Sequence, residues 1–142
     1  MSNLLVQNIK HTNNTTSMTV DSSGQVTIRG ENSATTTNLQ QGLCKSWILI
    51  DGTGTMENKD SHNVSGIVDN GTGDYSKTMT NPMNSIFYAA QTDSELTSDS
   101  CISTTIHSTN PTTTVVRGYT YQTSFSQVDS SYYTFVSHGD LA

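Results

Sequence analysis

The sequence predicts an all-β protein: an antiparallel β-sandwich head with a jelly-roll-like arrangement, preceded by a short N-terminal β-hairpin and assembled as a homotrimer. Short runs of alternating apolar and polar residues are separated by Gly, Asn and Asp, a pattern typical of half-buried strands. Ser and Thr supply 44 of the 142 residues, and Thr fits the pleated surface of a strand. Leu, Ile, Val and Phe supply only 27 residues, which is little for the core of one copy. We therefore expect several copies to share one interior.

The first 37 residues are expected to form a separate N-terminal segment. Two short apolar runs within 18–29 flank turn residues at 21–24, so this stretch predicts a β-hairpin. Residues 31–37 are expected to be polar and extended, and the linker 38–43 to contain a turn of helix that Gly42 ends. An isolated hairpin is not stable in water. The segment must therefore pack against the rest of the chain, another copy or a docking partner.

Residues 44–142 are expected to form the sandwich domain. Strand patterns recur at nearly regular intervals, at 46–51, 64–68, 75–79, 86–91, 101–107, 115–125 and 132–137. The strongest turn lies at 69–74 and contains Asn70-Gly71, a dipeptide preferred in type I′ hairpin turns. An acidic surface loop is expected at 92–100. Six or seven short strands with short connections are typical of a sandwich or jelly roll.

Aromatic residues supply the candidate core and the candidate recognition surface. Four of them are expected in the core: Trp47, Tyr75, Tyr88 and Phe125. Tyr132 and Tyr133 are consecutive, so one of them must face outward in a strand. Tyr offers rigid, amphipathic area for stacking on sugars or on a partner protein. The candidate receptor contacts are Tyr119, Tyr121, Tyr132 and Tyr133, with sheet packing or a subunit interface as the alternative role.

The charge of the chain argues against nucleic acid as a partner. The formal net charge is −6, and only six residues are Lys or Arg. Such a surface repels phosphate backbones, whereas neutral glycans remain compatible with it. The N-terminal residues include no basic region followed by a long apolar run, and no segment reaches transmembrane length. We therefore expect neither a secretory signal nor membrane insertion.

No pattern of metal-binding residues emerges. Cys44 and Cys101 are expected to be two partly buried thiols, and a disulfide between them is the alternative. The four histidines lack ligand spacing, although His107 repeated around a threefold axis could supply three ligands. Asp51, Asp69 and Asp74 in turns could bind calcium, but Asx-turn hydrogen bonds explain them equally well. We expect no metal or other cofactor.

The sequence also predicts that the protein is not an enzyme. It contains no Gly-x-Ser-x-Gly elbow and no phosphate-cradling loop with a lysine. Paired carboxylates of the kind that glycosidases use could come only from Asp93, Glu95 and Asp99 in the expected acidic loop, where solvation explains them. His138-Gly139-Asp140 lies at a terminus that is expected to be mobile.

Two stretches resemble a known group of proteins. Leu43-Cys44-Lys45-Ser46-Trp47 leads into Asp51-Gly52-Thr53-Gly54-Thr55, and Asp60-Ser61-His62-Asn63-Val64-Ser65 leads into Asp69-Asn70-Gly71-Thr72-Gly73-Asp74-Tyr75. This order of motifs resembles the distal domain of tail-fibre and other virion structural proteins of marine tailed phages. The resemblance covers residues 38–91, with a fainter likeness over 1–30. Cys44 and Met56 depart from it, since those positions are usually small or apolar.

The resemblance implies a phage virion structural protein. It implies a small trimeric tail fibre or spike, made in the host cytoplasm, exposed on the particle and contributing to host-surface recognition. Residues 1–37 would be the virion anchor or short stalk, with apolar side chains at Leu4, Leu5, Val6 and Ile9. The partners would be further copies of the chain, other tail or capsid proteins and a host surface glycan.

Three other functions are alternatives for the same residues. A capsid-decorating protein, such as a head fibre or cement protein, would use the N-terminal segment for docking and need bind nothing with its head. A non-viral carbohydrate-binding module is the second, and an enzyme acting on host polysaccharide is a weaker third. Glycan binding and the copy number per particle distinguish these functions.

Overall fold

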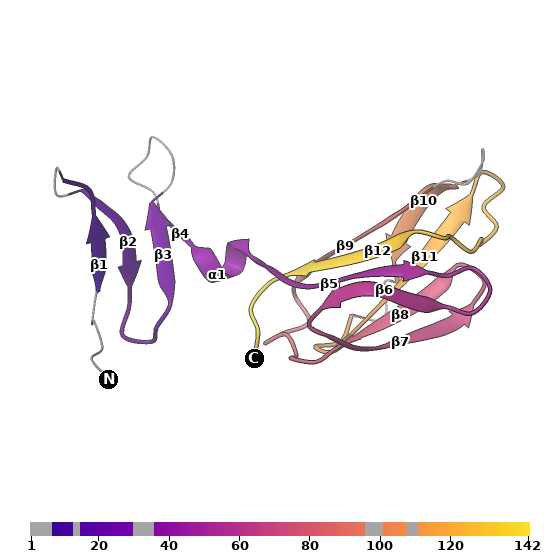
Figure 1. Ribbon diagram of the computed structural model, residues 1–142, viewed down its shortest axis with the longest axis horizontal. Coiled ribbons are helices and arrows are strands. Elements are labelled where there is room, and N and C mark those ends of the chain that lie inside the picture. Colours follow the sequence, from indigo (N-terminus) through magenta and orange to yellow (C-terminus); the bar gives the residue numbers. More distant parts are fainter. Residues whose placement is uncertain (1–6, 13–14, 30–35, 96–100, 108–110) are drawn as a thin grey trace. The chain divides into compact units, whose positions relative to one another are not determined.

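A computed structural model describes residues 7–12, 15–29, 36–95, 101–107 and 111–142, with the backbone alone described for residues 41 and 101–105. The chain divides into two compact units, Met1–Leu43 and Cys44–Ala142. Figure 1 shows the strands of both units.

The first unit contains a four-stranded antiparallel meander, the N-terminal sheet. Its strands are β1 (Asn8–Lys10), β2 (Thr16–Val20), β3 (Val26–Arg29) and β4 (Thr36–Asn38), followed by the helical turn α1 (Leu39–Gly42). The predicted hairpin is confirmed as β2 and β3, and the predicted turn of helix as α1. The Asp21 carboxylate closes the hairpin by accepting hydrogen bonds from the backbone of Ser23 and Gln25. The prediction of a hairpin alone was incomplete, since β1 and β4 extend it to a sheet.

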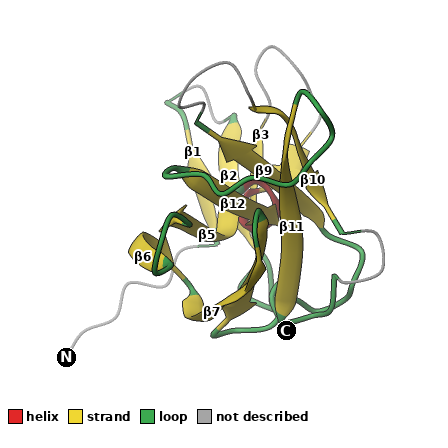
Figure 2. Ribbon diagram, turned by 90° about the vertical axis from the view of Figure 1, so that its right-hand side faces the viewer, coloured by secondary structure: helices red, strands yellow, loops and turns green. Residues whose placement is uncertain are grey.

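The second unit contains two antiparallel sheets of four strands each. The β5 sheet has the order β6-β5-β12-β9, and the β8 sheet has the order β10-β11-β8-β7. The strands are β5 (Cys44–Asp51), β6 (Glu57–His62), β7 (Val64–Gly71), β8 (Asp74–Met79), β9 (Ala89–Ser94), β10 (Cys101–Ile106), β11 (Val115–Gln122) and β12 (Tyr133–His138). Figure 2 shows these strands in a view turned by 90° from that of Figure 1 and labels all of them except β8.

Side chains from both sheets meet in one core, as a β-sandwich requires. The buried apolar residues are Ile48, Ile50, Tyr75, Met79, Met83, Val116, Tyr133 and Phe135. The Tyr133 ring makes edge contacts with Tyr75 from the opposite sheet and with Phe135 on its own strand, at centroid distances of 5.1 and 4.9 Å. The predicted all-β, antiparallel architecture is therefore confirmed.

One asparagine carries the chain from one sheet to the other. Asn63 stands alone between β6 and β7 and has a φ of 54°. Asparagine tolerates this left-handed region better than most residues. Its side-chain amide donates to the Lys45 carbonyl, and its side-chain oxygen accepts from the Asn81 backbone. These bonds hold the crossing against two other segments.

The hairpin turn between β7 and β8 differs from the prediction. Gly71 pairs with Asp74, so the turn lies at Thr72-Gly73, and Asn70 is not in the left-handed conformation that a type I′ turn would need. The Asn70 amide instead donates to the Ser76 hydroxyl at 2.9 Å. This cross-strand bond explains why the turn lies two residues later.

Two of the expected core aromatics lie elsewhere. Tyr75 is buried and Tyr88 packs against the core, but Trp47 is half-buried on the face of β5 opposite to Ile48. Phe125 is 83% exposed, because β11 ends at Gln122 and the alternation that predicted burial does not continue.

The C-terminal segment is held in place, contrary to the expected mobility. The Asn84 backbone donates to the Asp140 carbonyl at 2.8 Å, and the Ala142 backbone donates to the Pro82 carbonyl at 3.0 Å. Met83 and Leu141 form an antiparallel bridge between these bonds. Within the described residues, no helix has the length and apolarity needed to cross a membrane.

Candidate binding surfaces

The N-terminal sheet has one apolar face. Ile9 on β1 pairs with Met18 on β2, which pairs with Ile28 on β3, and Val20 pairs with Val26 two positions away. Because side chains alternate along a strand, these five residues share one face. None of the described residues of this unit is fully buried, and Ile9 is 51% exposed. Among the described residues of this unit, no buried core therefore covers the apolar face. The other anchor candidates, Leu4, Leu5 and Val6, lie outside the described residues.

The four candidate receptor tyrosines do not form one patch. Tyr133 is fully buried in the core, so its selection was wrong: of the two consecutive tyrosines, β12 turns this one inward. Tyr132 is 48% exposed and directly precedes β12, a strand of the β5 sheet. Tyr119 and Tyr121 lie on β11 in the β8 sheet, where the intervening Thr120 is buried.

Tyr119 and Tyr121 belong to an aromatic row on the outer face of the β8 sheet. Their ring centroids are 5.9 Å apart, and the His107 ring lies 5.2 Å from that of Tyr119. The Arg117 guanidinium lies 5.6 Å from the Tyr119 centroid. Its two-pronged hydrogen bond to the Asp74 carboxylate fixes it there and raises the pKa of Arg117. The row is therefore a rigid surface, half-buried within the single copy.

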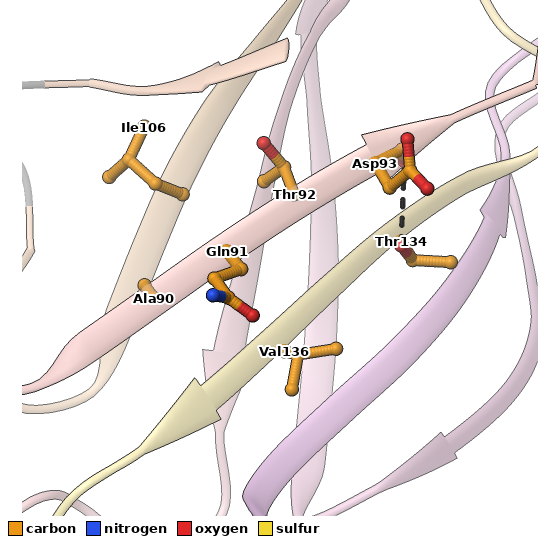
Figure 3. Close-up of a pocket in the computed structure, with 7 residues that line it drawn as sticks. All are labelled: Ala90, Gln91, Thr92, Asp93, Ile106, Thr134 and Val136. Carbon is orange, nitrogen blue, oxygen red and sulfur yellow. Dashed lines mark hydrogen bonds between the residues drawn. The ribbon is translucent and has the colours of Figure 1, made fainter.

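A groove runs along β9 and β12 on the other sheet. Its larger part has a volume of about 690 Å³ and is lined by Ala90, Gln91, Thr92, Asp93, Ile106, Thr134 and Val136. Its smaller part, about 380 Å³, adds Ser94, Glu95 and Tyr132, and shares Asp93 and Thr134 with the first. We call these two parts together the β9 groove. Figure 3 shows its larger part, with the bond from the Thr134 hydroxyl to the Asp93 carbonyl.

The strand register explains how the groove is lined. Gln91 pairs with Val136, and Asp93 pairs with Thr134, so these four side chains lie on the same outer face. The sequence did not reveal this groove. Asp93 was expected in an acidic surface loop, whereas β9 extends to Ser94 and places it in a strand.

A lysine is buried in the core beneath the two central strands of the β5 sheet. Lys77 is fully buried, and its ammonium donates to the Ser46 carbonyl and hydroxyl at 3.2 and 3.0 Å. Burial lowers the pKa of Lys77 to about 8. Ser137, which pairs with Ser46, has a buried hydroxyl without a hydrogen-bond partner among the described residues. Sequence reasoning did not reveal this polar end of the core, because Lys77 alternates in β8 like a surface residue.

The turn carboxylates have protein partners. Asp51 accepts hydrogen bonds from the hydroxyl and the backbone of Thr53, which lower the pKa of Asp51, and it lies 3.4 Å from the Lys59 ammonium. Asp69 accepts from the Gly71 backbone, and Asp74 binds Arg117. Within the described ranges, no three His, Cys, Asp or Glu side chains are grouped to hold a metal ion.

Cys44 is a free thiol. Its Sγ lies 3.4 Å from the Ser46 carbonyl oxygen and 3.7 Å from that of Ser137. Cys44 therefore forms no disulfide in the structure, contrary to the alternative of a bridge. The side chain of Cys101 lies outside the described residues.

Comparison of the chain with protein-family models, with curated proteins and with solved structures finds no match.

Proposed function

We propose that this chain is a non-enzymatic virion structural protein of a tailed phage, a small homotrimeric tail fibre or spike that contributes to host-surface recognition. The observation that carries the proposal is the apolar face of the N-terminal sheet, whose five side chains all stay at least partly exposed in a single copy. An apolar sheet face must be covered by another layer to be stable. Further copies of the same chain can supply that layer.

Three copies suit both units of the chain. Around a threefold axis, the N-terminal sheets would bury their apolar faces in one interior and attach the protein to the tail or capsid. The sandwich, in which the first and last strands β5 and β12 pair at the centre of one sheet, would face the host. Three heads on one stalk convert weak glycan contacts into useful avidity. The resemblance of residues 43–55 and 60–75 to phage fibre proteins supports both the virion class and the number three.

Paired substitutions on β3 test the assembly. Ile28→Asp places a charge on the apolar face, and Thr27→Asp places one on the opposite face of the same strand. We expect Ile28→Asp to dissociate the assembly in sedimentation velocity, because an unpaired buried charge is costly, and Thr27→Asp to leave it intact. Equal behaviour of the two variants would count against this face as the interface.

The virion assignment is tested on purified particles. Quantitative mass spectrometry should find the chain at the low copy number of a tail appendage. Hundreds of copies per particle would instead indicate capsid decoration, and absence from particles would overturn the virion role.

A further inference from the structure

The β9 groove combines the chemical groups that recognise saccharides. Tyr132 offers a half-exposed ring at one end, Val136 an apolar floor at the other, and Asp93 and Thr134 lie between them. Sugars present apolar ring faces edged by hydroxyls, so a stacking ring beside hydrogen-bonding side chains complements them. From Ala90 to Glu95 the strand extends about 17 Å, long enough for several sugar units.

Four polar side chains of the groove, Gln91, Asp93, Glu95 and Tyr132, are available to a ligand. The side chains of Gln91, Glu95 and Tyr132 make no hydrogen bond to any other residue in the described part of the chain. One Asp93 oxygen accepts from the Ser94 backbone at 2.9 Å. An amide, two carboxylates and a phenol can therefore pair with sugar hydroxyls without breaking bonds within the protein.

The charge of the groove selects the kind of saccharide. Asp93 and Glu95 lie along one strand, and the described lining includes no Lys, Arg or His. Sialylated or sulfated glycans would place anions beside these two carboxylates, which is unfavourable at short range. Neutral glycans meet no such repulsion.

We infer that the β9 groove is a binding site for an extended neutral saccharide. The inference rests on the proposed role in host-surface recognition and assigns that role to this face rather than to Tyr119 and Tyr121. Tyr132 stacks on a sugar ring, while Gln91 and Asp93 bind hydroxyls of neighbouring units.

Calorimetric titration of the full-length protein tests this inference. The probes are neutral hexasaccharides of glucose, mannose and galactose, together with sialylated and sulfated oligosaccharides of similar length. We expect at least one neutral probe to bind and the acidic probes not to bind. Tyr132→Ala should weaken binding about tenfold, which corresponds to the loss of one stacking contact. Tyr119→Ala and Phe87→Ala are the matched aromatic controls and should bind as the unmodified protein does, with thermal melting confirming that each variant is folded.

A charge-removing variant gives a second readout. Asp93→Asn combined with Glu95→Gln should admit the acidic probes, because the repulsion is gone while hydrogen-bonding groups remain. Three results would each overturn the inference. The first is that no neutral hexasaccharide binds, and the second is that the unmodified protein binds acidic probes equally well. The third is that Tyr119→Ala abolishes binding and Tyr132→Ala does not. Such a result from a protein that is trimeric and present on particles would leave the proposed function intact. Saccharide binding by a protein that is absent from particles would support the inference and overturn the proposed virion role.

Discussion

At the residue scale, Phe125 occupies a backbone conformation that glycine usually takes. Its φ is 61°, close to the values at Gly24 and Gly54. The backbone bonds from Phe125 to Gln122 and from Gln122 to Ser126, both 2.9 Å, define a three-residue hairpin loop whose last position is left-handed. Side chains at such positions are strained, and this one is largely exposed, so little packing offsets the strain.

Phe125→Gly should therefore raise the free energy of unfolding by about 1 kcal/mol. The substitution relieves the backbone strain of the folded state, and the greater conformational freedom of glycine in the unfolded chain offsets part of that gain. Urea unfolding measures the change at constant slope. The control is Phe87→Gly, at a residue that is 91% exposed and has no positive φ, which should bring no gain. If Phe125→Gly also failed to raise the free energy of unfolding, that result would contradict a strained loop.

Lys77 should make stability depend on pH. Burial lowers its pKa to about 8, whereas the unfolded chain keeps a value near 10.5. Between these values the unfolded state binds the extra proton, so the free energy of unfolding should rise with pH, by about 2 kcal/mol from pH 8 to 9.5. Lys77→Met should flatten this rise when unfolding is measured across that range. An unchanged slope in the variant would show that other groups cause it. The range stops at pH 9.5, because tyrosine titration opposes the trend at higher pH: burial raises the pKa of Tyr88 to about 12.

At the element scale, the β7–β8 hairpin depends on Gly73. Its φ is 62°, and an added Cβ would lie 2.6 Å from the Val128 carbonyl oxygen and 2.8 Å from that of Thr120. Its backbone N–H donates to the Asp129 carboxylate at 2.7 Å. The turn is thereby fitted against two backbone segments.

Gly73→Ala should lower the free energy of unfolding by about 3 kcal/mol, because the neighbours are backbone atoms that cannot rotate away. Gly66→Ala on β7 is the control, since its Cβ would meet nothing within 4 Å and its φ is ordinary. Equal stabilities of the two variants in chemical unfolding would refute the close fit at Gly73.

The sequence predicted hairpins best where turn residues mark them. Asp21 closes the predicted turn at 21–24 with hydrogen bonds from the backbone of Ser23 and Gln25, whereas the expected Asx bond of Asp69 to the Gly71 backbone lies at the end of β7, before the turn. Strand β6 was missed because Glu57–His62 lacks apolar alternation: it is an edge strand held by its pairing with β5. β1 and β4 are likewise short and at the edges of their sheet. Such edge strands are held by pairing to a neighbouring strand, and this pairing produces no alternation of apolar and polar residues in their sequences.

The candidate surfaces were predictable only in part. Alternation correctly placed Tyr119 and Tyr121 on one face, but it could not decide which of Tyr132 and Tyr133 faces inward. That depends on the register of β12 against β5, a contact between the two ends of the sandwich domain. The β9 groove likewise arises from long-range pairing, and no local motif indicated it.

At the scale of the whole molecule, the two units differ in how they are stabilised. The sandwich unit encloses a core from both sheets, whereas the N-terminal sheet has an apolar face and no fully buried residue in its described part. Among the described residues, it is thus the first unit that lacks a closed core. The proposed trimer therefore has to assemble through that unit.

Light scattering of the full-length protein at micromolar concentration measures this requirement directly. The account predicts a mass three times the 15.4 kDa of the chain. A species of 15.4 kDa that melts cooperatively, with its N-terminal sheet intact, would contradict it.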